Sequence, residues 1–234
     1  MHIRLALDKG YQGKTLAWAL DYPGCFSYGE DDAEVLLRIP GELLKFETWI
    51  KDHTDLTWID FTDLDLNIVE VVHSYTINEG YLPSLGKLEI NAFFRDDWRP
   101  LNSQEIDNAL LVFKWQREEL LAGLGTLSIE ILEKQRLGQR WNILGIVKHI
   151  ANAENWYLDR LGFTSIPKAD LPKDPIKRLN LLQKFINSEY LKFEGDGRVQ
   201  GVDGELWSCR KILRRTLWHQ RDHIDHIKQL VFDI

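Results

Sequence analysis

Three histidines lie within eight positions near the C-terminus, in the stretch "LWHQRDHIDHI" from Leu217 to Ile227. His219, His223 and His226 are spaced i, i+4 and i+7, and on an α-helix they would share a stripe about 60° wide. A pair at i, i+4 can aim two ring nitrogens at one metal ion. The pattern fits equally well a helix end whose histidines are solvated or bonded to nearby acids, so the cluster alone leaves both interpretations open.

A fourth histidine favours the metal interpretation. His149 lies in "WNILGIVKHIANAENWYLDRLG", on the same helical stripe as Ile146, Ala153, Trp156 and Tyr157. A buried histidine needs a polar partner, and a hydrogen bond to a neighbouring helix could supply one. If the neighbour is the histidine-rich helix, His149 faces the pair His219 and His223. Three neutral imidazoles then leave one or more coordination positions open, as in catalytic metal sites.

Other polar residues could assist such a site. Asp222 and Asp225 are placed to accept hydrogen bonds from imidazole N–H groups, which would fix the ring tautomers. Glu154 follows His149 by five positions, about 140° around the helix, and is expected to be a surface charge. Three arginines of the last helix could attract an anionic substrate or form a solvated face: Arg214, Arg215 and Arg221.

The first hundred residues predict a small α+β domain. His2 to Asp8 and Thr15 to Asp21 are expected to form a hairpin, and a helix is expected from Asp31 to about His53, capped by Asp31 or Asp32. Pro40 should kink or break this helix. Two further strands, Asn67 to Thr76 and Lys87 to Phe94, bracket a loop that contains Asn78, Gly80, Pro83 and Gly86. The order β-β-α-β-β favours a small antiparallel sheet with one helix on one face.

The remainder predicts helices alone. The polar connector "RDDWRPLN" marks a boundary, giving domains at residues 1–98 and 99–234. Helices are expected from Ser103 to about Gly123, from about Trp141 to Leu161, from about Asp174 to Phe193 and from about Leu206 to Phe232, with "EGDGRVQGVDGE" as a loop before the last. We therefore expect an all-α, up-down four-helix bundle after the α+β domain.

Composition excludes some classes of function. The net charge of −7 over 234 residues argues against nucleic acid as a partner, because phosphate binding relies on Lys and Arg. No apolar stretch reaches the roughly 18 residues of a membrane span, and no targeting segment is evident, so we expect a soluble cytoplasmic protein without a membrane partner. Cys25 and Cys209 form no CxxC pattern, and Cys25 is expected to be a buried small residue.

Two segments resemble a known family. "RWNILGIVKHIANAENWYLDRL" and "ELWSCRKILRRTLWHQRDHIDHI" are similar to the second and fourth helices of the DinB-like family, which is grouped with the YfiT-like metal-dependent hydrolases and thiol-dependent transferases. The resemblance covers about Ser103 to Leu230. It implies that His149, His219 and His223 bind a divalent metal, zinc or nickel, and that His226 lies outside the ligand set. The segment from Leu16 to Ile50 resembles, more weakly, the HicB-like fold, without implying an antitoxin role.

The resemblance implies hydrolysis or thiol transfer on a small molecule, with a thiol as one substrate class, and we expect a homodimer. No catalytic residue beyond the metal ligands is predicted. A second hypothesis is a non-enzymatic binding or dimerisation protein in which the metal only holds helices together. A third is a regulatory module that binds a partner through its N-terminal sheet.

Overall fold

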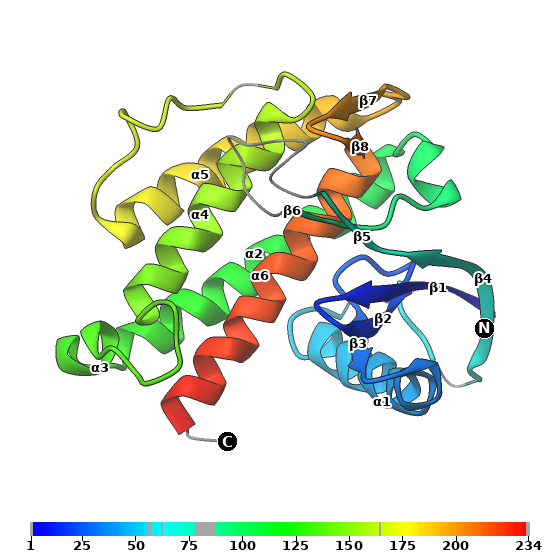
Figure 1. Cartoon of the computed structure of the whole chain (residues 1–234), viewed down its shortest axis with the longest axis horizontal. Helices are drawn as coiled ribbons and strands as arrows, with labels where there is room; N and C mark the ends of the chain where they lie inside the picture. The colour runs from blue at the N-terminus through cyan, green and yellow to red at the C-terminus, as the bar shows by residue number, and fades with distance from the viewer. Residues whose placement is uncertain (1, 56–57, 62, 78–87, 164, 233–234) are drawn as a thin grey trace. The chain divides into compact units, whose positions relative to one another are not determined.

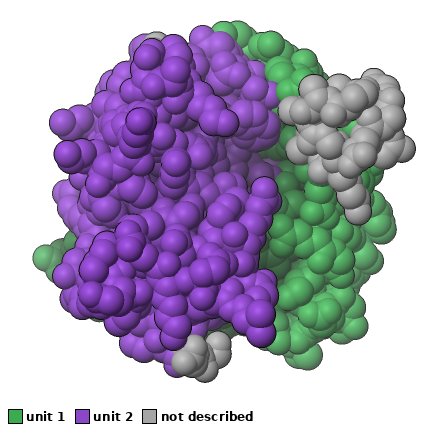
Figure 2. All heavy atoms as spheres, turned by 60° about the vertical axis from the view of Figure 1, so that its left-hand side comes forward, with its two compact units in different colours: residues 1–99, 197–211 green, residues 100–196, 212–234 purple. Residues whose placement is uncertain are grey.

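The computed structural model describes the whole chain except residues 1, 56–57, 62, 78–87, 164 and 233–234 (Figure 1). The described residues divide into two compact units, coloured separately in Figure 2. Unit 1 comprises Met1–Arg99 and Gly197–Lys211, and unit 2 comprises Pro100–Asp196 and Ile212–Ile234. Each unit is therefore built from two stretches of chain.

A four-stranded mixed sheet forms the centre of unit 1. Strands β1 (His2–Tyr11) and β2 (Lys14–Ala19) make the predicted hairpin, and β3 (Phe26–Gly29) and β4 (Asp65–His73) complete the order β3-β2-β1-β4. The prediction of an antiparallel sheet is wrong, because β4 runs parallel to β1. The sequence prediction overlooked the short β3. The helix after β3 connects β3 at one edge of the sheet to β4 at the other edge. Such a crossover connection lets β4 run parallel to its neighbour β1.

Helix α1 (Asp32–Lys51) is that crossover. The Asp31 side chain caps it by accepting a hydrogen bond from the backbone N–H of Glu34. Pro40 lies inside the helix without ending it, so the alternative of a break is not observed. The buried residues Val35, Ile39 and Leu43 recur at helical spacing and give α1 an apolar face.

Two small antiparallel pairs and a 3₁₀ turn complete unit 1. β5 (Tyr75–Ile77) pairs with β6 (Leu88–Ile90), and the 3₁₀ helix η1 covers Arg95–Trp98. The predicted loop with Asn78, Gly80, Pro83 and Gly86 lies outside the described residues. β7 (Val199–Val202) pairs with β8 (Glu205–Ser208), joined by Asp203 and Gly204 at φ values of 54° and 82°. Positive φ at both turn residues is typical of a tight hairpin.

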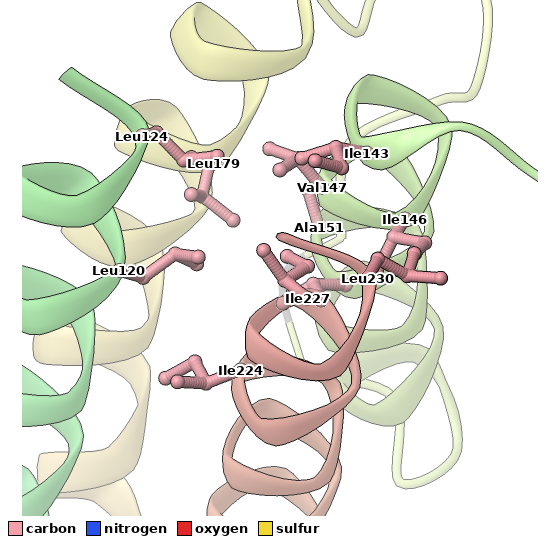
Figure 3. Close-up of a cluster of buried hydrophobic side chains, with 11 residues drawn as sticks. Leu120, Leu124, Ile143, Ile146, Val147, Ala151, Leu179, Ile224, Ile227 and Leu230 are labelled. Atoms are coloured by element: carbon pink, nitrogen blue, oxygen red, sulfur yellow. The ribbon is translucent and has the colours of Figure 1, made fainter. Parts of the chain in front are cut away.

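Unit 2 is predominantly helical. It contains α2 (Ser103–Gly125), α3 (Ile129–Glu133), α4 (Ile143–Asp159), α5 (Pro175–Glu189), the 3₁₀ helix η2 (Tyr190–Phe193) and most of α6 (Cys209–Phe232). One apolar cluster joins α2, α4, α5 and α6, and Figure 3 shows its side chains converging from these helices. Its buried members are Leu120, Leu124, Ile143, Ile146, Val147, Ile150, Ala151, Leu179, Ile224, Ile227 and Leu230.

The predicted fold class is wrong for the second half of the chain as well. Residues 99–234 are not an all-α, up-down four-helix bundle, because the hairpin β7–β8 interrupts them and α3 is an additional short helix. The last helix begins at Cys209 rather than Leu206, since Leu206 belongs to β8. The segment "EGDGRVQGVDGE", which was expected to be a loop, is rich in glycine and aspartate. Asp203 and Gly204 of this segment form the turn of the β7–β8 hairpin. Among the described residues, none of the helices combines the length with the apolar character that a membrane span requires.

Candidate metal centre

Two well-anchored helices carry the candidate ligands. The Asn142 side chain caps α4 by accepting a hydrogen bond from the backbone N–H of Gly145 at 2.8 Å, and His149 follows two turns later. At the start of α6, the Ser208 hydroxyl accepts a hydrogen bond from the backbone N–H of Lys211 at 3.2 Å. The apolar stripes of α4 and α6 meet in the core cluster. The histidines beside those stripes are therefore held on rigid elements.

The side chains of His149, His219 and His223 converge. Nε2 of His219 lies 3.1 Å from Nε2 of His149 and 3.1 Å from Nε2 of His223. One ring nitrogen from each residue falls within 4.8 Å of the other two. Residues seventy positions apart thus meet at one point, and they are the three residues that the resemblance to the DinB-like family implied.

The donor set fits a metal ion. Two nitrogen ligands of one tetrahedral zinc, each about 2.0–2.1 Å from it, lie about 3.3 Å apart, close to the two spacings observed. Hydrogen bonds among the three rings fit less well. Both short contacts involve Nε2 of His219, and this one atom cannot donate to one ring and accept from the other at the same time. His219 is only 7% exposed, so solvent has little access to the point where the three Nε2 atoms meet. One cation would satisfy all three inward-facing lone pairs.

The surroundings keep the three imidazoles neutral. Burial is the main cause that lowers the pKa of each ring, and it brings the pKa of His223 to about 3. The neighbouring rings and two guanidinium groups add to the effect, because Arg140 acts on the pKa of His149 and Arg215 on that of His219. Neutral imidazole is the form that binds metals, so the ligands need not lose protons near pH 7.

Aromatic side chains fix the ring orientations. The indole of Trp141 stacks on His149 with ring centroids 4.6 Å apart and an interplanar angle of 27°. The guanidinium of Arg140 lies 4.4 Å above the same indole. Behind His219, the ring of Tyr157 stands edge-on at 6.1 Å, and its hydroxyl accepts a hydrogen bond from Arg215 at 3.2 Å. Trp141 therefore contributes to the site as well as to packing.

The remaining predicted residues lie apart from the cluster. His226 contacts Gln139, with 2.9 Å between Nε2 and the side-chain oxygen, and it is not a member of the converging set. Asp225 forms ion pairs with Arg221 at 3.3 Å and Lys228 at 3.8 Å. Neither Asp225 nor Asp222 bonds the Nδ1 atoms of His219 and His223, so their expected role as hydrogen-bond acceptors for these rings is wrong within the described part of the chain.

One expectation about a nearby charge is also wrong. Glu154 is buried rather than exposed, and it forms an ion pair with Arg117, which is itself fully buried. Arg117 further donates to the side chain of Gln220. A sequence signal existed, because Glu154 follows Val147 by seven positions and Ile150 by four, on the apolar stripe of α4.

The sequence matches no family model, and no curated protein is similar enough to count as a relative.

Proposed function

We propose that this protein binds one divalent metal ion through His149, His219 and His223 and uses it to transform a small molecule. The convergence of three neutral Nε2 atoms from α4 and α6 carries the proposal. Three protein ligands leave at least one coordination position for a substrate or water, the arrangement of catalytic metal sites. Zinc and nickel are the proposed ions, because imidazole nitrogen suits both.

The proposed chemistry is hydrolysis or transfer of a thiol. A bound divalent ion would lower the pKa of a water or thiol ligand and would polarise a carbonyl group. The protein's own residues favour the same outcome electrostatically. The charges that act on the ligand rings belong to Arg140 and Arg215, and positive charge near the site favours an anion over its neutral conjugate acid.

Similarity to the DinB-like and YfiT-like proteins supports this class of reaction. The support is residue by residue, since the histidine of "GIVKHIANAE" and the pair in "LWHQRDH" are the three residues whose nitrogens converge. We take the family assignment itself as part of the proposal.

A non-enzymatic role is the second candidate. The ligands come from two helices that are seventy residues apart in sequence, so a bound metal would cross-link α4 and α6. Such a cross-link stabilises a fold even when nothing else binds the ion.

Metal titration of single variants tests the site. We expect one Zn²⁺ or Ni²⁺ per chain, and His149→Ala and His223→Ala should each weaken binding by about 100-fold or more. His226→Ala is the matched control. It also removes an imidazole from α6, but the ring of His226 contacts Gln139 and does not belong to the converging set. Its affinity should stay within about threefold of the unaltered protein. Wild type that takes up neither ion, or a His226→Ala loss as large as the others, would sink the proposal.

Cobalt substitution separates the two candidate functions. The visible spectrum of bound Co²⁺ reports its coordination, so addition of a small thiol should change the spectrum if a position is open. A spectrum that no added thiol or anion alters indicates that protein groups complete the coordination. In that case the enzymatic proposal fails and the structural one stands.

A further inference from the structure

A buried polar network links the four helices around the core of unit 2. Arg117 of α2 has no exposed surface, and its guanidinium reaches three elements. It donates to a carboxylate oxygen of Glu154 on α4, to the backbone carbonyl of Leu179 on α5 at 2.9 Å, and to the side-chain oxygen of Gln220 on α6 at 2.7 Å. One side chain thus bonds to each of the other three long helices of the unit.

Gln220 is held twice more by α2. Its amide nitrogen donates to the backbone carbonyl of Phe113 and to the side chain of Gln116, both at 3.1 Å. Gln220 directly follows His219, so these bonds fix the rotation of α6 at the residue next to a proposed ligand. Glu154 lies five residues after His149, about 7.5 Å along the helix axis, and ties α4 to the same guanidinium.

Apolar packing alone fixes the rotation and register of α4 and α6 less strictly than these hydrogen bonds do. The contacts of Ile224, Ile227 and Val147 are non-directional, and branched aliphatic side chains can pack in more than one register. Hydrogen bonds to a planar guanidinium are directional, and slippage by one residue would break all of them. Metal ligation needs this precision, because ligand distances tolerate only about 0.2 Å.

We propose that Arg117, with Glu154 and Gln220, is a positioning device that sets α4 and α6 in the register at which the three histidine nitrogens meet. The inference rests on the proposed metal site. It assigns a function to the buried pair Arg117 and Glu154. Replacing a buried pair of this kind by apolar residues is often neutral or favourable for stability.

The test replaces the pair by apolar residues in the full-length protein. Arg117→Met combined with Glu154→Leu should preserve the circular dichroism spectrum and cooperative thermal unfolding, but weaken Zn²⁺ binding by about 10- to 100-fold, as disruption of groups that orient metal ligands does. The Co²⁺ spectrum should also change, which a loss of stability alone would not cause. Glu154→Gln keeps an oxygen that accepts from Arg117 and should retain affinity within about threefold.

The control treats another buried pair in the same way. Lys211 and Glu205 form an ion pair at 2.7 Å in unit 1, with side chains 0% and 5% exposed. Lys211→Met with Glu205→Leu should leave Zn²⁺ affinity within about threefold. If wild type binds metal and the Arg117–Glu154 double variant binds it with the same affinity and Co²⁺ spectrum, the positioning role is refuted and the metal site stands. If wild type binds no metal, both proposals fail. If the double variant does not fold, Gln220→Met decides, because it removes one acceptor of the Arg117 guanidinium and should weaken Zn²⁺ binding by about tenfold; unchanged affinity would contradict the network's role.

Discussion

The buried carboxyl of Glu154 predicts how the free energy of unfolding changes with pH, and the sign of that change tests the electrostatics inside unit 2. Burial raises the pKa of its carboxyl to about 7 in the folded protein, against 4.5 ordinarily, even though the charge of Arg117 opposes the change. The folded state therefore holds a proton on Glu154 between about pH 4.5 and pH 7 that the unfolded state has released. Stability falls with rising pH wherever the folded state binds more protons, so ionisation of this group costs stability over that window.

The perturbation is Glu154→Gln, which removes the titration and keeps the shape. A difference of 2.5 pKa units at about 1.4 kcal/mol each corresponds to about 3 kcal/mol. The free energy of unfolding of wild type, measured relative to the variant, should therefore be highest at pH 4.5 and below. It should fall by about 3 kcal/mol as pH rises to 7 and above, where the advantage of the protonated carboxyl is lost.

Urea unfolding of both proteins at half-unit pH steps, with a chelator present, measures this difference. Histidines and other carboxylates titrate in both proteins and cancel. Glu118→Gln is the control, because the Glu118 side chain on the same helix as Arg117 is 56% exposed, and its effect should stay within about 0.5 kcal/mol at every pH. A wild type that gains on the Glu154→Gln variant as pH rises would show that attraction to Arg117 outweighs burial, and the reasoning would be wrong.

Four further substitutions test the fold. Lys211→Met should lower the free energy of unfolding by about 3–5 kcal/mol, because it leaves Glu205 buried without its cation; a thermal melt unchanged from wild type contradicts this. Pro40→Ala should raise it by about 1–3 kcal/mol by restoring a helical hydrogen bond within α1, and a loss in chemical denaturation would show that the proline suits a bent helix. Gly29→Ala should lower it by about 2 kcal/mol or more, because the added carbon would stand 2.5 Å from a backbone nitrogen, whereas Gly41→Ala, which meets nothing within 4 Å, should be neutral or stabilising; equal effects at the two positions would refute the steric argument.

Helical periodicity placed the histidines on shared faces, and the resemblance to the DinB-like family selected the three that converge. The spacing of His219 and His223 fixes two rings on one face whatever surrounds them, and His149 needed only a neighbouring helix. The expected hairpin of the first two strands is also confirmed, because its turn and alternating pattern are local features.

The errors came from one very short strand, from a turn composition that also suits loops, and from one contact between residues distant in sequence. β3 has four residues, too few to show alternation, and without it the direction of β4 could not be derived. The hairpin β7–β8 was hidden by glycine and aspartate, which favour loops and tight turns alike. Glu154 was misplaced because a charged residue is rarely buried unless paired, and its partner Arg117 lies thirty-seven residues earlier on another helix.

The path of α6 has a consequence for the order in which the protein can be completed during synthesis. Its first three residues, Cys209 to Lys211, belong to unit 1, and the same helix continues into unit 2 with His219 and His223. Unit 1 therefore still lacks β7 and β8 when its first ninety-nine residues have been made, and His149 is made seventy residues before its partners. A cut after Arg99 therefore leaves unit 1 without Gly197–Lys211, whereas residues 100–234 still contain all of unit 2, and the converging histidines are complete only once His223 has been made.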